Sequence, residues 1–414
     1  MTNFSRRTLL AGLSAAALTP LVSAATRHPI LPQTSAPPVP TMPPMRMIAT
    51  NGIRLAVYEA GAGPAIVLLH GFPGLAYTWR YQIPALAAAG YRVIVPDLRG
   101  YGLSDMPAQV EDYDIDHLTG DLAGLLDALG EPQAVFMGHD WGGLLAWQMA
   151  LLQRQRVAGV ISLNTPHIPH WMLWLHPDLV RTADPARRGF VAAPDVDPIA
   201  QMRDIYRPEM YVLMFQDGQA ADTVMNADPR AALRNALRKD LGTPAGWDRL
   251  PPEIRHMVYY GQPAPAQLPG RDVLTTQELE FYAGKYRRTG FTPAINWYRN
   301  ISRNWRAGRD IDQTVAAPAL MLCAANDVVL RPSMTAGMEA HVKRLERHVL
   351  ADCWHWSAEE KPAAVNRLAL GWLGRHYPAR RIAVAATGLS SPTRAVRAGQ
   401  APNNAPHFQP GRTT

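Results

Sequence analysis

Short runs of continuous apolar residues alternate with helical patterns between about residues 66 and 163, and this alternation constrains the fold more than any other feature. The apolar runs lie at residues 66–69, 92–95, 134–137 and 160–163. The helical patterns between them lie at about residues 75–88, 116–129 and 141–153. Strands that are buried on both faces read as continuous apolar runs. The pattern therefore predicts an α/β fold with a mostly parallel sheet that carries helices on both faces.

A long insertion interrupts this alternation. Residues 165–310 contain many prolines and aromatic residues and have a mostly helical pattern. Strands are predicted again at 318–323 and 347–350, and a helix at 361–376. Because the insertion follows a core strand, we expect it to lie over the carboxyl edge of the sheet, where open α/β sheets bind ligands. The body then comprises a core at 45–164 and 311–377, with a helical lid at 165–310.

The first 24 residues have the three regions of an export signal. Arg6 and Arg7 precede an apolar, Ala-rich segment of about 15 residues, which is shorter than the ~20 residues that a membrane-spanning helix needs. The segment ends in a small-x-small cleavage pattern at Val22, Ser23 and Ala24. Paired arginines ahead of a mildly apolar segment resemble bacterial twin-arginine signals. We therefore predict cleavage after Ala24, export by the twin-arginine machinery to the periplasm or the medium, and no integral membrane segment.

The net charge of +7 is located at the two ends of the chain. Residues 1–24 and 378–414 together hold seven arginines and no acidic residue, so the rest of the chain is neutral overall. A nucleic-acid-binding protein needs a basic face on its folded body, and the composition gives no sign of one. Residues 25–44 are rich in proline and are predicted to be an extended linker. Residues 378–414 lack apolar periodicity and are predicted to be a disordered basic tail.

A strand-to-helix turn carries the strongest chemical signal. The predicted strand 134–137 runs into GHDWGG at 138–143, and a helical pattern follows. A nucleophile between small residues at such a turn is the nucleophile elbow of hydrolases, with Asp140 in the place of the usual Ser. The backbone N–H of Trp141 would then point at the reacting oxygen. Taken alone, the motif fits equally well an Asp that caps a helix among turn glycines.

A second loop supplies the other expected hydrogen-bond donor. HGFP at 70–73 closes the predicted strand 66–69. In hydrolases with a nucleophile elbow, this loop provides the second backbone N–H that stabilises the oxyanion. We assign that N–H to Phe72, although the same motif also fits an ordinary loop.

The candidate acid and base lie at the ends of two later strands. The predicted strand 318–323 is followed by Asp327, and 347–350 is followed by His355. The order nucleophile, acid, histidine along the chain is that of α/β-hydrolases. Asp352 is a rival for the acid, but three positions before His355 leave little room to orient the imidazole ring. We therefore predict Asp140 as nucleophile, His355 as base and Asp327 as the acid that orients it.

Residues 46–377 resemble the epoxide hydrolases of the α/β-hydrolase fold found in bacteria and as soluble eukaryotic enzymes. The motifs that carry the resemblance are HGFP at 70–73, DLRGYGLSD at 97–105, GHDWGG at 138–143, YVLMFQ at 211–216, and Gly290-Phe291 followed by NWYRN at 296–300. The resemblance implies a mostly parallel eight-stranded sheet with a helical lid over its carboxyl edge. It also implies that Tyr211 and Tyr298 bind the epoxide oxygen. Family members continue the first lid motif with Gln-x-Pro-Gly and this chain does not, so Tyr206 remains an alternative to Tyr211.

The resemblance also implies a mechanism. Asp140 attacks a small apolar epoxide and forms an ester, and His355 activates a water that hydrolyses the ester. Trp141, Trp297 and Phe72 are the expected substrate contacts. No cofactor is required, and the remaining His, Asp and Glu residues lack the spacing of a metal site.

Two other functions remain open at this point. A haloalkane or haloacid dehalogenase of the same fold also uses an Asp nucleophile, and Trp141 could donate to a halide. However, Phe72 stands where haloalkane dehalogenases place an Asn donor, and its side chain has no donor. A non-catalytic binding module is disfavoured because nucleophile, base and acid are all present. Cys323 and Cys353 are expected to be two buried thiols, with a disulfide as the alternative.

Overall fold

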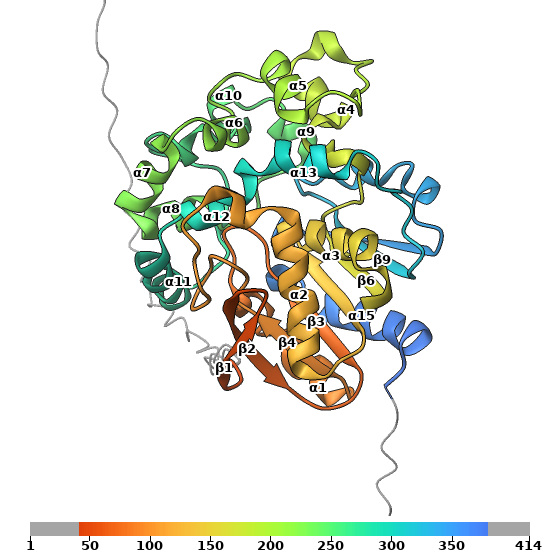
Figure 1. The fold of residues 1–414 in the computed structure, drawn as a ribbon. Helices are drawn as coiled ribbons and strands as arrows, with labels where there is room; N and C mark the ends of the chain where they lie inside the picture. Colours follow the sequence, from red (N-terminus) through yellow and green to blue (C-terminus); the bar gives the residue numbers. More distant parts are fainter. Residues whose placement is uncertain (1–40, 380–414) are drawn as a thin grey trace, which may run out of the picture. The chain divides into compact units, whose positions relative to one another are not determined.

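The computed structural model describes residues 41–379 (Figure 1). The predicted signal peptide, nearly all of the predicted linker and nearly all of the predicted basic tail lie outside these residues. Within residues 41–379, no helix is both long and apolar enough to cross a membrane.

A single eight-stranded sheet forms the centre of the core. Its strands lie in the spatial order β1-β2-β4-β3-β5-β6-β9-β10. Their bounds are β1 Met45–Thr50, β2 Ile53–Ala60, β3 Ala65–Leu69, β4 Arg92–Pro96, β5 Ala134–His139, β6 Val157–Leu163, β9 Ala319–Ala324 and β10 Leu345–Leu350. Strand β2 is antiparallel to both of its neighbours, and the other pairings are parallel. The predicted α/β-hydrolase fold is confirmed.

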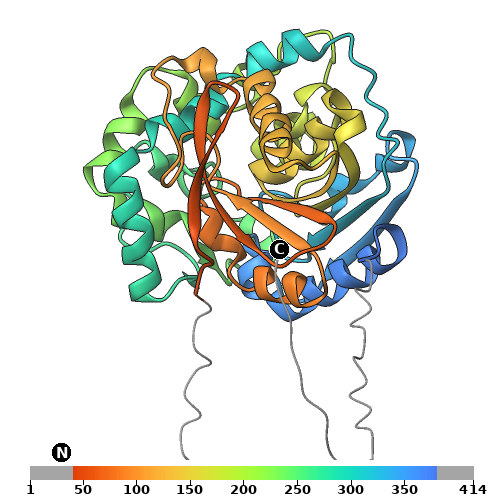
Figure 2. The same ribbon diagram turned by 60° about the horizontal axis from the view of Figure 1, so that its bottom comes forward.

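Helices cover both faces of this sheet, as the continuous apolar strands predict. They are α1 Gln82–Ala88, α2 Ile115–Leu129, α3 Trp141–Leu152 and α15 Pro362–His376. Ile66 of β3 belongs to the same core as Trp372 of α15, whereas the next residue, Val67, shares a core with Trp147 of α3. Figure 2 shows α1 and α15 (orange and blue) on one side of the sheet and α2 and α3 on the other.

One predicted helix is divided. Residues 75–88 form a 3-10 turn at Ala76–Trp79 and then the separate helix α1. Pro84 explains the break, because a proline lacks the N–H needed inside a helix but is tolerated in its first turn. A helix that contains Pro84 must therefore begin close before it, and α1 begins at Gln82.

The segment between β6 and β9 forms the lid, which lies above the sheet in Figure 1. Its helices are short: α4 Pro177–Ala183, α5 Pro198–Ile205, α6 Tyr211–Gln216, α7 Ala220–Ala227, α8 Pro229–Ala236, α9 Pro244–Trp247, α10 Pro252–Arg255, α11 Thr276–Thr289, α12 Thr292–Arg299 and α13 Ile301–Gly308. Five of them begin with proline, which fits the first helical position because its missing N–H is not needed there. Two short strands, β7 Arg238–Lys239 and β8 Arg271–Asp272, pair within the lid and were not predicted.

A buried ion cluster joins the lid to the core. Arg80 follows the 3-10 turn and is 2% exposed. Its Nη2 lies 2.9 Å from Oε1 of Glu278 in lid helix α11. Its Nη1 lies 2.5 Å from Oε1 of Glu359 in α14 (Ser357–Glu360), the short helix that follows His355. One guanidinium therefore holds two buried carboxylates from different parts of the fold.

Candidate active site

Asp140 occupies a strained turn between β5 and α3. Its backbone has φ 54° and ψ −122°, a conformation that residues with a side chain rarely adopt. The glycines around it are required because a side chain would not fit at their positions. A Cβ at Gly142 would lie 2.1 Å from the carbonyl oxygen of Leu69, and one at Gly71 would lie 2.4 Å from Cβ of Asp140. The turn therefore has the geometry of a nucleophile elbow.

Two backbone N–H groups serve the carboxylate of Asp140. The Phe72 N–H donates to Oδ1 at 2.7 Å, and the Trp141 N–H also bonds the carboxylate. Burial raises the pKa of Asp140, while the charge of His355 and these two N–H groups oppose the rise. The carboxylate thus lies within reach of both N–H groups that were predicted to stabilise the oxyanion.

His355 and Asp327 form an ion pair beside the nucleophile. Nδ1 of His355 lies 2.9 Å from Oδ2 of Asp327, and Nε2 lies 3.8 Å from Oδ2 of Asp140. Burial disfavours the imidazolium, but the charge and hydrogen bond of Asp327 outweigh it and raise the pKa of His355 to about 9. Burial likewise disfavours the Asp327 carboxylate, yet His355 lowers its pKa to about 2. The rival acid, Asp352, is exposed.

Three residues that the sequence analysis missed hold this ion pair in place. The Asn164 amide donates to Oδ2 of Asp327 at 2.6 Å and to the carbonyl of His355 at 3.1 Å. Nε2 of His139 lies 2.7 Å from the same carbonyl. Glu360 accepts from the backbone N–H groups on both sides of His355, those of residues 354 and 356. The sequence held a signal for two of them: Asn164 directly follows a core strand, and His139 directly precedes the nucleophile.

The lid places two phenols over the nucleophile. Tyr211 of α6 and Tyr298 of α12 line the same cavity as Asp140, with ring centroids 5.9 Å apart. Burial raises the pKa of both, so each hydroxyl stays protonated and can donate. Tyr206, the alternative to Tyr211, donates its hydroxyl to the Trp174 carbonyl at 2.7 Å and lines a neighbouring cavity instead. The geometry thus favours Tyr211 over Tyr206.

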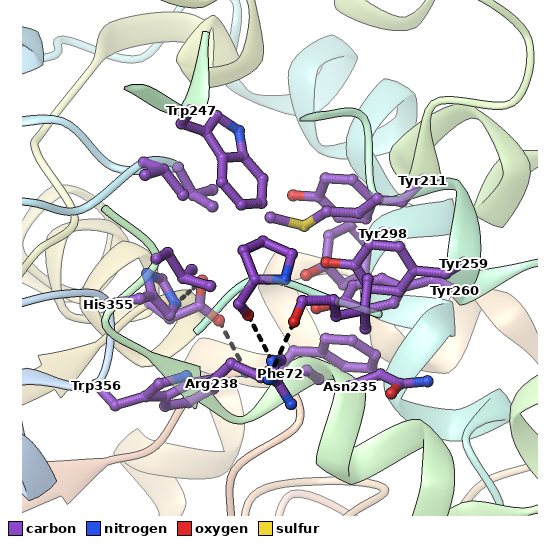
Figure 3. Close-up of a pocket in the computed structure, with 18 residues that line it drawn as sticks. Phe72, Tyr211, Asn235, Arg238, Trp247, Tyr259, Tyr260, Tyr298, His355 and Trp356 are labelled. Carbon is purple, nitrogen blue, oxygen red and sulfur yellow. Dashed lines mark hydrogen bonds and ion pairs between the residues drawn. The ribbon is translucent and has the colours of Figure 1, made fainter. Parts of the chain in front are cut away.

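The cavity at Asp140 is mostly apolar and is shown in Figure 3. Centres of water-sized molecules can occupy about 50 Å³ of it. Phe72 and His355 line it, and Trp141 lines an adjoining cavity that also reaches Asp140. Trp297 was expected to contact substrate, but it lines none of the cavities described around Asp140. Its indole N–H donates to the carbonyl of Arg99 at 3.1 Å, and its ring packs behind Trp141 with centroids 5.7 Å apart.

The two cysteines lie close to the acid and the base but are not bonded to each other. Both Cys323 and Cys353 are buried free thiols, as expected. Burial raises the pKa of Cys323 to about 11, so it is not a thiolate at neutral pH. Within residues 41–379, no group of three or more His, Cys, Asp or Glu residues is arranged to hold a metal ion.

Known proteins with a similar sequence or structure support this fold. The family model described as alpha/beta hydrolase fold matches residues 64–196. Epoxide hydrolase A of Mycobacterium tuberculosis is 38% identical over 339 residues, which are 80% of this chain and 97% of the relative. The structure of epoxide hydrolase A from Mycobacterium thermoresistibile has a TM-score of 0.65 and 37% identity, covering 80% of this chain and 98% of that one.

A longer relative matches over part of its length. Bifunctional epoxide hydrolase 2 of Mus musculus is 39% identical over 324 residues, which are 78% of this chain and 54% of the relative. The chain thus spans about half the length of this mammalian relative.

Proposed function

The chain belongs to the family of epoxide hydrolases with the α/β-hydrolase fold, and from this premise we propose that it opens small, mostly apolar epoxides to vicinal diols through an ester on Asp140. The observation that carries the mechanism is the position of the Asp140 carboxylate. Oδ1 accepts from the Phe72 N–H, Oδ2 faces His355, and Tyr211 and Tyr298 line the same cavity.

In the first step, Oδ2 of Asp140 attacks an epoxide carbon. A carboxylate can do so without first losing a proton. The C–O bond of the epoxide breaks, its electron pair passes to the epoxide oxygen, and one of the two phenols, Tyr211 or Tyr298, gives this oxygen its proton. Their hydrogen bonds strengthen as negative charge develops, so they stabilise the transition state more than the bound substrate. Oδ1 remains against the Phe72 N–H and becomes the carbonyl oxygen of the ester.

In the second step, His355 takes a proton from water, and the resulting hydroxide attacks the ester carbonyl. The negative charge on Oδ1 is then stabilised by the N–H groups of Phe72 and Trp141. The diol oxygen leaves with the proton that His355 took from water. Asp140 is then a carboxylic acid, and its proton returns to the phenol that gave one up in the first step, which restores the Asp140 carboxylate. Asp327 keeps the imidazole ring oriented and stabilises its cation.

Ester formation also prepares the base. The negative charge of Asp140 is one of the causes that raise the pKa of His355. That charge disappears when the ester forms, so the pKa of His355 falls and the ring gives up its proton more readily. His355 therefore becomes a competent base at the stage that needs one.

The test is the mass of the protein after it reacts. In His355→Gln the attack by Asp140 needs no base, but hydrolysis does, so we expect a mass increase equal to one epoxide. Replacing Asp140 with Asn in the same background should abolish the increase. A His355→Gln protein that binds substrate yet keeps its original mass would indicate direct attack by water instead.

A further inference from the structure

The cavity at Asp140 continues into two arms that are lined by different side chains. Both arms share Asp140, Tyr211 and Tyr298 in their walls. One arm is walled mainly by aliphatic and indole side chains: Leu144, Leu173, Trp174, Val329 and Leu330. The other arm is also mostly apolar, but it adds four side chains with hydrogen-bonding groups, all from the lid: Asn235, Arg238, Tyr259 and Tyr260. A substrate that spans Asp140 would therefore place its two sides in different surroundings.

Two polar groups of the first arm already have hydrogen-bond partners, whereas the buried Nε1 of Trp141 has none among the described residues. The Thr165 hydroxyl donates to the carbonyl of Asp140 at 2.8 Å, and the Trp174 indole N–H donates to the Tyr211 hydroxyl at 3.4 Å. The Trp141 indole packs against Tyr298, with ring centroids 4.9 Å apart. This arm thus suits an apolar substituent.

The second arm contains hydrogen-bonding groups without partners. Tyr260 is 8% exposed, and its ring lies 5.6 Å from that of Tyr211 and 6.3 Å from that of Phe72. Within the described part of the chain, its hydroxyl makes no hydrogen bond, and neither do the Tyr259 hydroxyl and the Asn235 amide. Figure 3 shows the rings of Tyr259 and Tyr260 beside those of the two lid phenols. The Tyr260 hydroxyl is therefore free to donate to a ligand in this arm, and a ligand with an acceptor there gains a hydrogen bond.

Arg238 contributes to this arm without being free to bind a ligand. Its guanidinium donates to the carbonyls of residues 268, 269 and 270 and to the carboxylate of Asp272. It therefore holds the wall of the arm, and Tyr260, whose ring lies 6.3 Å from that of Phe72, remains as a donor. Burial raises the pKa of Tyr260, so the hydroxyl is a donor at neutral pH.

We propose that Tyr260 binds an acceptor oxygen of the substrate, so that the enzyme prefers epoxides with an ether or carbonyl oxygen on one substituent and an apolar group on the other. The inference rests on the proposed function and adds the substrate class. In this proposal Tyr211 and Tyr298 bind the epoxide oxygen, whereas Tyr260 binds a second oxygen in the second arm.

A matched pair of substrates tests the proposal. In trans-1-methoxy-2,3-epoxyheptane, an ether oxygen stands where trans-4,5-epoxynonane has a methylene group. We expect the ratio of kcat/KM for the ether to kcat/KM for the hydrocarbon to fall about tenfold in Tyr260→Phe, the loss of one neutral hydrogen bond. The ratio cancels the difference in intrinsic reactivity between the two epoxides.

Tyr286→Phe is the control, because the Tyr286 hydroxyl is buried without a partner and lines none of the cavities described around Asp140. It should leave the ratio unchanged. If Tyr260→Phe leaves kcat/KM the same for both substrates, or lowers both by the same factor, the ratio does not change and the proposal is overturned. A loss of the same factor on both substrates would place Tyr260 at the epoxide oxygen. If the wild-type enzyme opened neither epoxide, the proposed function itself would be wrong. That result differs from a wild-type enzyme that opens both epoxides and a Tyr260→Phe variant with an unchanged ratio.

Discussion

His355 lies between two carboxylates, and only that of Asp327 keeps its charge throughout the proposed reaction. Its pKa of about 9 applies to the resting protein, in which Asp140 is also charged. We expect the rate of ester hydrolysis to rise with pH through a pKa below about 9, because hydrolysis needs the neutral ring and the Asp140 charge has gone. Single-turnover measurements from acid to alkaline pH give this value, and NMR titration of His355 gives the resting one. Equal values would contradict the proposed change.

The two lid phenols act on the oxygen that leaves carbon, so their removal should affect one step. We expect Tyr298→Phe and Tyr211→Phe each to slow ester formation on the order of tenfold or more, while ester hydrolysis stays nearly the same. The double variant should be almost inactive on epoxides. Rapid-quench analysis of ester formation and decay separates the steps. If Tyr206→Phe slowed ester formation and Tyr211→Phe did not, the assignment of the first phenol would be wrong.

At the residue level, the sequence was most informative where the chemistry is local. Asp140 could be predicted because a strand, small residues and a helix stand around it in one short segment. Asn164 could not, because its role depends on β6 lying beside β9, which brings its amide to Asp327. The position of Trp297 could not be predicted either, because it depends on the packing of α12, which places that ring behind Trp141.

At the level of elements, the predicted strands were those buried on both faces, except for β10, an edge strand with exposed residues. Strands β1 and β2 lie at the sheet edge and carry polar residues on one side, so they lack a continuous apolar run. The helical lid was predicted as one segment, but the places where its short helices begin and end depend on packing. Tyr259 and Tyr260 lie in a 3-10 turn of the lid, at Val258–Tyr260, and no local pattern indicated that they face Asp140.

The attachment of lid helix α11 to the core gives a prediction about stability. In Arg80→Met, the carboxylates of Glu278 and Glu359 lose their cation while still buried, so we expect a loss of about 3–5 kcal/mol in the free energy of unfolding at pH 7. The deficit should shrink as the pH falls, because burial already raises the pKa of Glu359 and protonation removes its charge. Urea unfolding at pH 7 and pH 5 measures both effects.

The control for this prediction is an exposed ion pair. Arg154 pairs with Asp312 at 3.2 Å, with 44% and 62% of their side chains exposed. Arg154→Met should therefore change stability little. An equal loss in the two variants would show that the Arg80 cluster contributes no more than a surface pair.

At the scale of the whole molecule, epoxide opening and dehalogenation place different demands on one fold. A departing alkoxide needs proton donors, which Tyr211 and Tyr298 can supply, whereas a halide needs neutral N–H donors, of which Trp141 is the one obvious example. We expect kcat/KM for an apolar epoxide to exceed that for the bromoalkane of the same skeleton by orders of magnitude. Diol and bromide release from the matched pair measure it. Faster turnover of the bromoalkane than of the epoxide would favour the assignment as a dehalogenase.

We propose that the whole chain is exported by the twin-arginine route, on the basis of Arg6, Arg7 and the cleavage pattern that ends at Ala24. Replacing both arginines with lysine should leave the chain in the cytoplasm with its first 24 residues uncleaved. Cell fractionation and the mass of the product measure this. Unchanged delivery to the periplasm would exclude the twin-arginine route, and the variant Arg380→Lys serves as a control for a change of the same kind elsewhere.

Strands β6 and β9 are neighbours in the sheet, with Val160 beside Ala319, yet the entire lid lies between them in the chain. During synthesis, β6 therefore emerges with one edge unpaired until β9 has been made. At roughly 5–20 residues per second, translation of the lid takes on the order of 10–30 s. An apolar, unpaired strand edge can associate with other chains over that interval. We therefore expect the nascent chain to be most prone to aggregation while residues 164–318 are being added. A ribosome-bound chaperone should reduce aggregation most during the same interval.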